Sequence, residues 1–249
     1  MKKIILILCI LTSTASYAQN ALTFDGAGDC VTTPLTFSTQ PQFTYEGWIY
    51  LTSLGPSVQD VFGANGGSEI VISSTDIRVW IGSTGSQTIW SHNSTTFPLN
   101  MWHHLAVTGD GSNIKIYVDG ILKQTQAGST GNYGSGTQFK MGAAIWAGAN
   151  DFNGTMDEVR VWSTARTQAE IKNNMFGENL SAGQTGLVAH YKFNEGSGTT
   201  AINSCTNTSG IDGNLTGGPA WVASPIYLAA NALHFDGTDD RVSVPTGYP

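Results

Sequence analysis

Short alternations of apolar and polar residues, separated by turn-forming residues, run through most of the chain. Residues 114–119 read IKIYVD, a period of two that predicts a strand with one buried face. Asp119-Gly120 then predicts a tight hairpin turn into a second strand over 121–124. The ranges 43–51, 68–73, 77–81 and 102–108 predict further strands, and clusters of Gly, Ser, Asn and Thr separate them. The pattern therefore predicts a protein built mainly of β-strands.

One segment has the pattern of a helix instead. Thr167 is followed three residues later by Glu170, which is the spacing of a capping box. Ile171 and Met175 then fall on one helical face, and Gly177 is placed to end the helix. One short helix near 168–176 among many strands predicts an all-β sandwich with a helical connection rather than an α/β fold.

The start of the chain is repeated near its end. Residues 20–34 read NALTFDGAGDCVTTP and residues 231–245 read NALHFDGTDDRVSVP, with nine of fifteen positions identical and no gap. Because an isolated strand cannot fold alone, we interpret 19–228 as one domain and 229–249 as the truncated start of a second copy. The alternative is that the copied strand pairs within the first domain. The run LVAHYKF at 187–193 is expected to close a sheet of that first domain.

The first residues are typical of a secretory signal. Lys2 and Lys3 precede a short apolar run over 4–11, and small residues lead up to Ala18. This pattern predicts a signal peptide over 1–18, and the apolar run is too short to span a bilayer. The mature protein is therefore expected to be secreted or at the cell surface. Loss of the two lysines changes the formal charge from -7 to -9, which argues against a nucleic-acid partner.

Two cysteines remain after removal of the signal, Cys30 and Cys205. Cysteines in an oxidising compartment often pair. The repeat has Arg241 at the position of Cys30, so the strand itself does not require a cysteine there. We therefore predict a Cys30–Cys205 disulfide, with two free thiols as the alternative.

An ordered set of motifs adds a family resemblance. The set comprises FDG at 24–26 with Asp29 and Val31, FT and GWI within 43–49, WHHLA at 102–106, YVDG at 117–120 and FNGTMDEVRVW at 152–162. It resembles the laminin-G-like jelly-roll domains of the concanavalin A-like lectin/glucanase superfamily, as in secreted and surface repeat proteins of Bacteroidetes-type bacteria. It is more distantly similar to the pentraxins. The resemblance covers about residues 20–225 and implies a two-sheet antiparallel jelly-roll sandwich.

The chain lacks the run of alternating acidic residues that the superfamily's glucanases carry on one strand. Asp157 and Glu158 are adjacent, so on a regular strand they point to opposite faces. His103 and His104 are also adjacent, which favours a structural role over metal chelation. No catalytic residue is predicted, and the chain is expected not to be an enzyme.

Three carboxylates are candidate ligands of a structural Ca²⁺. Asp25 and Asp29 flank a glycine-rich turn, and Asp157 begins a late strand that a jelly roll can place beside the first strand. Hard oxygen ligands gathered from two loops suit Ca²⁺. The alternative is that Asp25 only forms a turn and that Asp157 caps backbone amides.

Lectin-like jelly rolls commonly stack sugars on aromatic rings and hydrogen-bond sugar hydroxyls with Asn, Asp and Gln. Residues of these types in or beside the expected loops are therefore candidates for ligand binding. The candidates are Trp90, Asn93, Trp146, Asn150 and Asp151. Trp90 and Trp146 are the best stacking candidates because small or polar residues surround them. The alternative is that each aromatic residue is a half-buried packing residue.

These features predict a non-catalytic extracellular binding module. Its expected partner is a glycan, a matrix component or a cell-surface protein, and further modules of the same parent chain are expected beside it. Two alternatives stay open: an accessory domain of a larger polysaccharide-degrading enzyme, and a structural spacer in a tandem adhesin.

Overall fold

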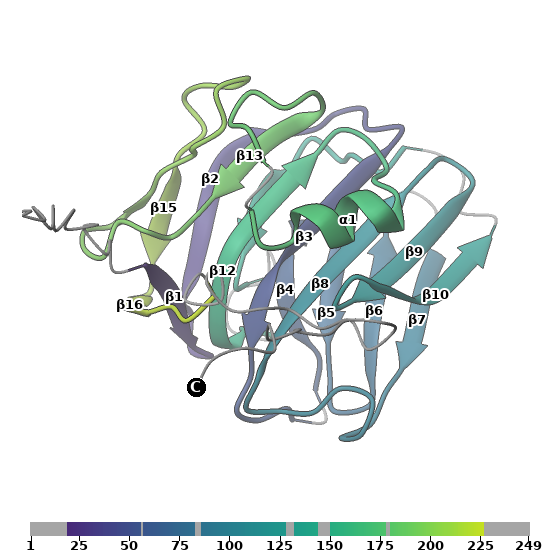
Figure 1. Cartoon of the computed structure of the whole chain (residues 1–249), viewed down its shortest axis with the longest axis horizontal. Helices are drawn as coiled ribbons and strands as arrows, with labels where there is room; N and C mark the ends of the chain where they lie inside the picture. Colours follow the sequence, from purple (N-terminus) through teal and green to yellow (C-terminus); the bar gives the residue numbers. More distant parts are fainter. Residues whose placement is uncertain are drawn as a thin grey trace, which may run out of the picture.

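The computed structural model describes residues 19–55, 57–82, 86–127, 132–143, 150–177 and 180–226. These residues form two antiparallel β-sheets packed face to face, together with one short helix (Figure 1). The all-β sandwich predicted from the alternation of apolar and polar residues is therefore confirmed.

The first sheet is built from β1 (Asn20–Asp25), β3 (Phe43–Tyr50), β8 (Trp102–Gly109), β9 (Asn113–Val118), β10 (Ile121–Ala127), β12 (Asn153–Trp162), β13 (Leu187–Tyr191) and β16 (Ala220–Ala223). Its strands pair in the order β10-β9-β8-β3-β12-β1-β16. The long strand β12 pairs with β1 through its first half and with β13 through its second half. The first and the late strands are thus neighbours, as the sequence suggested.

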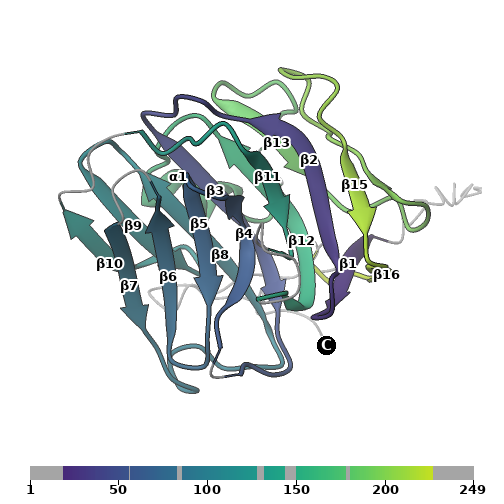
Figure 2. The same ribbon diagram turned by 180° about the vertical axis from the view of Figure 1, so that it is seen from behind.

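The second sheet is built from β2 (Cys30–Thr36), β4 (Gln59–Ala64), β5 (Ser68–Ile72), β6 (Asp76–Ile81), β7 (Ser86–Ser91), β11 (Gln138–Met141), β14 (Thr200–Ala201) and β15 (Gly213–Thr216). Its strands pair in the order β14-β15-β2-β11-β4-β5-β6-β7. Figure 2 shows this sheet toward the viewer, with the helix behind the sandwich.

Local sequence signals account for the hairpin and the helix. Asp119 and Gly120 have φ values of 54° and 70°, the positive values that a tight two-residue hairpin turn requires between β9 and β10. Helix α1 (Gln168–Asn174) begins after Thr167, whose hydroxyl accepts the Glu170 amide at 3.3 Å. The Glu170 carboxylate accepts the Thr167 amide at 2.8 Å, which completes the predicted capping box.

The main core lies between the two sheets. Fully buried aromatic rings from both sheets meet there, with ring centroids 5.1 Å apart for Tyr45 of β3 and Phe139 of β11. Each buried apolar side chain of this size stabilises the fold by about 1.5–3 kcal/mol. Tyr191 and Phe193, from the late run over 187–193, are also fully buried, so that segment is part of this sandwich.

The two outer faces differ. Helix α1 covers the first sheet, with Ile171 packed on Ala106 and Tyr117 (Figure 1). Among the described residues, α1 is the only helix, and it is too short and too polar to cross a membrane. No described helix covers the outer face of the second sheet.

Candidate functional site

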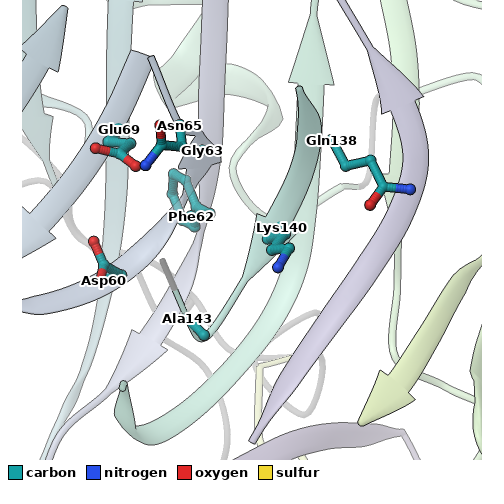
Figure 3. Close-up of a pocket in the computed structure, with 8 residues that line it drawn as sticks. All are labelled: Asp60, Phe62, Gly63, Asn65, Glu69, Gln138, Lys140 and Ala143. Carbon is teal, nitrogen blue, oxygen red and sulfur yellow. The ribbon is translucent and has the colours of Figure 1, made fainter. Parts of the chain in front are cut away.

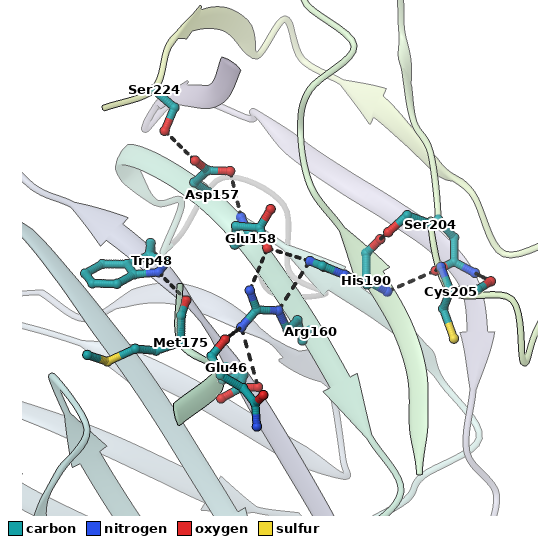
Figure 4. A network of polar contacts seen from close by, with 12 residues as sticks. Glu46, Trp48, Asp157, Glu158, Arg160, Met175, His190, Ser204, Cys205 and Ser224 are labelled. Carbon is teal, nitrogen blue, oxygen red and sulfur yellow. Dashed lines mark hydrogen bonds and ion pairs between the residues drawn. The ribbon is translucent and has the colours of Figure 1, made fainter. Parts of the chain in front are cut away.

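A network of charged side chains lies on the outer face of the first sheet, next to the end of α1 (Figure 4). Arg160 donates to a Glu158 carboxylate oxygen at 2.6 Å, and the same oxygen lies 2.6 Å from Nε2 of His190. The Trp162 indole donates to Glu46 at 2.8 Å. All five side chains are buried. Buried charges are tolerated when they are paired, as they are here. Their contacts join β3, β12 and β13.

The prediction that Asp157 and Glu158 point to opposite faces is wrong. A β-bulge shifts the register of β12 between Asp157 and Arg160, and Glu158 takes a φ of 54°. The extra residue turns both carboxylates to the same side of the sheet. There Asp157 contacts the Ser224 hydroxyl, whereas Glu158 contacts Arg160 (Figure 4).

Burial dominates the electrostatics of this network. Burial raises the pKa of Asp157 to about 8, although the Ser224 hydrogen bond acts in the opposite direction. Burial also raises the pKa of Glu46, and the charge of Arg160 partly offsets that rise. The pKa of His104 is lowered to about 3 by burial and by Arg160. Because these groups are shielded from solvent, the network holds the sheet together and is out of reach of a substrate.

The two predicted histidines have separate structural roles. Nδ1 of His103 lies 2.9 Å from the Asp119 carboxylate, and the ring stacks on Phe97 with centroids 4.3 Å apart. His104 is fully buried against Trp48, with ring centroids 5.3 Å apart. The rings therefore have different surroundings and do not form a common metal site.

The structure does not bring the predicted metal ligands together. Asp25 lies opposite Asn153 of β12, whereas Asp157 is four residues further along that strand. At the usual rise per strand residue this separation is about 13 Å. Among the described residues, no group of three or more His, Cys, Asp or Glu side chains is arranged to hold a metal ion. Asp157 therefore does not fit a shared site with Asp25 and Asp29.

The carboxylates of this set hold local backbone instead. Asp29 accepts the Asp25 amide at 2.9 Å, and Asp25 accepts the Ala27 amide at 2.8 Å. Asp157 accepts the amide of Glu158 at 2.8 Å. These are the turn and capping interactions of the alternative interpretation. Calcium at the Asp25–Asp29 turn stays a prediction, which melting with and without a chelator tests.

The structure contradicts the predicted Cys30–Cys205 disulfide, because both cysteines are free and buried. Sγ of Cys30 lies 3.7 Å from the Thr32 hydroxyl in the second sheet. Sγ of Cys205 donates to the Leu187 carbonyl at 3.3 Å, beside the first sheet. The absence of another cysteine in the mature chain suggested the pairing, but no feature of the sequence determines the distance between the two sulfurs.

Trp90 and Asn93 serve the packing of one end of the sandwich. Trp90 is half-buried against the core, and its ring centroid lies 6.5 Å from that of Phe97. The Asn93 side chain accepts the amides of Thr95 and Thr96 at 2.9 and 3.1 Å, so it stabilises a turn. Asn93 also lines a pocket of about 90 Å³, whose other lining residues are Leu54, Ser74, His92, Ser94, Phe97 and Leu99.

Asn150 and Asp151 connect neighbouring loops. The Asn150 carbonyl accepts the Asp60 amide at 2.7 Å, and the Asp151 carboxylate accepts the Gly28 amide at 2.7 Å. Trp146 lies outside the described residues. The other four predicted ligand residues are therefore not gathered into one site by the described part of the chain.

A pocket that the sequence did not reveal lies on the outer face of the second sheet (Figure 3). It is lined by Asp60, Phe62, Gly63, Asn65, Glu69, Gln138, Lys140 and Ala143. Its volume is about 10 Å³, roughly the room that one water molecule needs. The pocket is therefore a shallow depression in the sheet surface.

Gly63 lies at the centre of this depression, between two charged residues. It is opposite Lys140 of β11 on one side and opposite Glu69 of β5 on the other. Its φ is +149°, and a Cβ atom there would lie 2.3 Å from the Ser68 carbonyl oxygen. Only glycine fits this position, so Lys140 and Glu69 flank a place that carries no side chain.

The two charged side chains beside Gly63 have no described partner within the protein. Lys140 and Glu69 are half-buried, and neither side chain has a hydrogen bond or an ion pair with another described residue. Burial raises the pKa of Glu69. Trp80 of β6 lies opposite Glu69 and is 36% exposed, which adds an aromatic surface. Partly desolvated polar groups without internal partners, beside an exposed aromatic ring, are typical of binding sites.

A weak signal for these residues is present in the sequence. Glu69 is the single charge in the strand SEIVI, and Lys140 is the single charge in QFKM. A lone charge on a strand usually indicates only the solvated face, so neither residue stands out without the pairing of the strands.

Comparison with protein families identifies the fold. A family model described as the concanavalin A-like lectin/glucanases superfamily matches residues 25–172. The chain belongs to this superfamily. The resemblance inferred from the ordered motifs is thereby confirmed. The match ends at Lys172 in α1, so the strands from β13 onward lie beyond it.

Two solved structures of similar fold accompany the superfamily match. A protein from Bacteroides ovatus, described as a candidate carbohydrate-binding protein, has a TM-score of 0.68 and 22% identity over 83% of this chain and 60% of its own. A heptameric SAP-like pentraxin from Limulus polyphemus has a TM-score of 0.60 and 13% identity over 84% of this chain and 97% of its own. At these identities the likeness concerns the fold.

One curated relative matches part of the chain. Mouse pappalysin-1 is 33% identical over 91 residues, which are 35% of this chain and 6% of pappalysin-1. The chain therefore spans a small part of the length of that relative, and 60% of the Bacteroides ovatus protein.

Proposed function

We propose that this superfamily member is a non-catalytic extracellular module that binds a glycan on the outer face of its second sheet. The observation that carries the proposal is the position of Lys140 and Glu69, half-buried on either side of Gly63. A pyranose ring above the glycine would present one hydroxyl that donates to Glu69 and another that accepts from Lys140. Trp80 would supply a stacking surface beside it.

Two further observations support the proposal. No described helix lies over the outer face of the second sheet (Figure 2), and Trp80 and Gln138 on that face are exposed. The Bacteroides ovatus protein of the same fold is described as a candidate carbohydrate-binding protein. The signal-like pattern of residues 1–18 is the basis for the extracellular part of the proposal.

The non-catalytic part of the proposal rests on access to carboxylates. Asp157, Glu158 and Glu46 of the first sheet are at most 1% exposed. The depression on the second sheet holds Asp60 and Glu69, but Asp60 is only 6% exposed. The backbone amide of Asp60 donates to the Asn150 carbonyl. A glycosidase needs both carboxylates in contact with the sugar, so we expect binding without hydrolysis.

A glycan array probed with residues 19–228 tests the proposal. We expect binding to glycans that Lys140→Ala or Glu69→Gln weakens about tenfold, which corresponds to about 1.4 kcal/mol. Lys115→Ala is the matched control, because Lys115 lies on the first sheet and pairs with Asp110 at 3.3 Å. No binding to any glycan would contradict the proposal. Release of reducing ends from a bound polysaccharide would contradict its non-catalytic part.

A further inference from the structure

The residues that flank Gly63 belong to a longer row that crosses the second sheet. The pairing register aligns one residue from each of six adjacent strands, and we call this set the polar row. Its members are Asn214 of β15, Thr32 of β2, Lys140 of β11, Gly63 of β4, Glu69 of β5 and Trp80 of β6.

The polar row lies on the outer face of the second sheet. Successive residues of a strand point to opposite faces, and the sequence neighbours of the row members face the core. These buried neighbours include Val31, Ile70, Val79, Phe139 and Met141. The five side chains of the row are exposed or half-buried, and the sixth member, Gly63, is buried and has no side chain. In Figure 2 the strands that carry them lie side by side from β15 to β6.

The dimensions of the polar row suit an extended chain. Neighbouring strands are about 4.8 Å apart, so the row from Asn214 to Trp80 extends for roughly 24 Å. One pyranose ring in an extended glycan covers a length similar to one strand spacing. Beyond Asn214 the register continues to the exposed Thr200 of β14, so the row is open at that end. The depression at Gly63 is shallow, which suits a chain lying across the surface.

We propose that the polar row binds an internal stretch of an extended, neutral glycan that runs perpendicular to the strands, with one sugar ring above Gly63. This inference rests on the proposed function and adds the class and the direction of the ligand. Asn214 and Thr32 can each donate and accept hydrogen bonds, Lys140 donates and Glu69 accepts. Trp80 stacks on a ring further along the chain.

The charges favour a neutral chain over an acidic one. The polar row carries one cation, Lys140, and one anion, Glu69, and Asp60 adds a carboxylate to the same depression. The whole sequence has a formal charge of -7. A chain of uronic acids would gain one ion pair at Lys140 and would be repelled by the neighbouring carboxylates and by the net charge.

The test measures how affinity depends on the length of the glycan. The mature protein is run in affinity gels that contain xyloglucan, galactomannan, arabinan or polygalacturonate. For a polysaccharide that retards it, the dissociation constants of the disaccharide, tetrasaccharide and hexasaccharide are compared by calorimetry. We expect a neutral polysaccharide to bind, and the hexasaccharide to bind at least about tenfold more tightly than the disaccharide.

Variants at the two ends of the polar row separate the inference from the proposed function. Trp80→Ala and Asn214→Ala are expected to weaken the hexasaccharide about fivefold to tenfold and to leave the disaccharide unchanged. Thr36→Ala is the matched control, because Thr36 is exposed on the same strand as Thr32 but lies outside the row. Circular dichroism melts confirm that each variant is folded.

The possible results are distinct. Absence of binding to any glycan overturns both the inference and the proposed function. Equal affinity for the disaccharide and the hexasaccharide overturns the inference and leaves the proposed function in place. The same holds if Lys140→Ala prevents binding while Trp80→Ala and Asn214→Ala have no effect. A preference for polygalacturonate overturns the assignment of a neutral chain.

Discussion

The Ser224 hydroxyl is hydrogen-bonded to the carboxylate of Asp157, and this contact joins the segment after β16 to β12 (Figure 4). The Ser224 amide also donates to the Gln19 carbonyl at 2.8 Å. Asp157 is completely buried, so its ionised form loses hydration that one hydroxyl only partly replaces. The result is a carboxyl group whose pKa is raised to about 8.

Asp157 is expected to make stability fall as pH rises. The pKa of an aspartate in the unfolded chain is about 3.9. The folded state therefore binds the Asp157 proton more tightly than the unfolded chain does. The contribution of the protonated Asp157 to the free energy of unfolding is fully present below about pH 4 and is lost as pH rises through about 8. Asp157→Asn cannot ionise, so the melting temperature of this variant should depend less on pH across that window.

Melting temperatures at about pH 5 and pH 8.5 provide the measurement. Ser224→Ala is the control, since it keeps the carboxyl group and should keep the pH dependence. Parallel curves for the parent protein and Asp157→Asn would show that Asp157 does not titrate in this way.

Removal of the cation from the buried network should be strongly destabilising. Arg160→Met leaves Glu158 without the guanidinium that now lies 2.6 Å away, and both side chains are fully buried. We expect a loss of about 3–5 kcal/mol in the free energy of unfolding. Urea denaturation measures it. In the matched variant Arg78→Met, which removes a partly exposed partner of Asp76, the loss should be about 1 kcal/mol or less.

Cys30 and Cys205 should be titratable thiols. Since Cys30 and Cys205 are free and buried, a thiol reagent should label neither in the native protein and both in denaturant without reductant. Reductant should leave the melting temperature unchanged. An increase in intact mass on reduction would show that a disulfide is present and would contradict the structure.

Two truncations should behave in opposite ways. A chain ending at Ile226 keeps every described strand. Its free energy of unfolding should be within about 1 kcal/mol of that of the full chain. A chain ending at Gly186 loses β13 to β16 together with the buried Tyr191 and Phe193. Each buried side chain contributes about 1.5–3 kcal/mol, so the sum rivals the stability of a domain and the shorter chain should not fold. Thermal melts of the two chains decide the matter.

Features with local causes could be read from the sequence. The turn at Asp119-Gly120 needs only two residues that accept positive φ, and the capping box needs only Thr167 and Glu170 at their spacing. Their hydrogen bonds close within a few residues, so no knowledge of the rest of the fold is required. The period-2 alternation that marks β9 and β13 as strands is also local, although β13 pairs with the distant β12.

Features that depend on pairing between distant strands could not be predicted from the sequence. The alignment of Lys140 with Gly63 is set by the register of β11 against β4. The alternation within each strand fixes the face on which Lys140 lies, but a shift of two residues would keep that face and change the residue opposite it, so no local signal selects Gly63. The bulge that turns Glu158 toward Arg160 likewise arises from the packing of β12 between its neighbours.

The pairing of β1 with β16 sets Asn20 opposite Ala223. The two ends of the sandwich therefore leave from adjacent strands of the first sheet, while Lys140 and Trp80 lie on the second. Such a unit can be spliced into a surface loop of a host protein without forcing the host's flanking segments apart. It would then project as a side branch, and the face proposed to bind glycans would need no rearrangement of the host to be displayed.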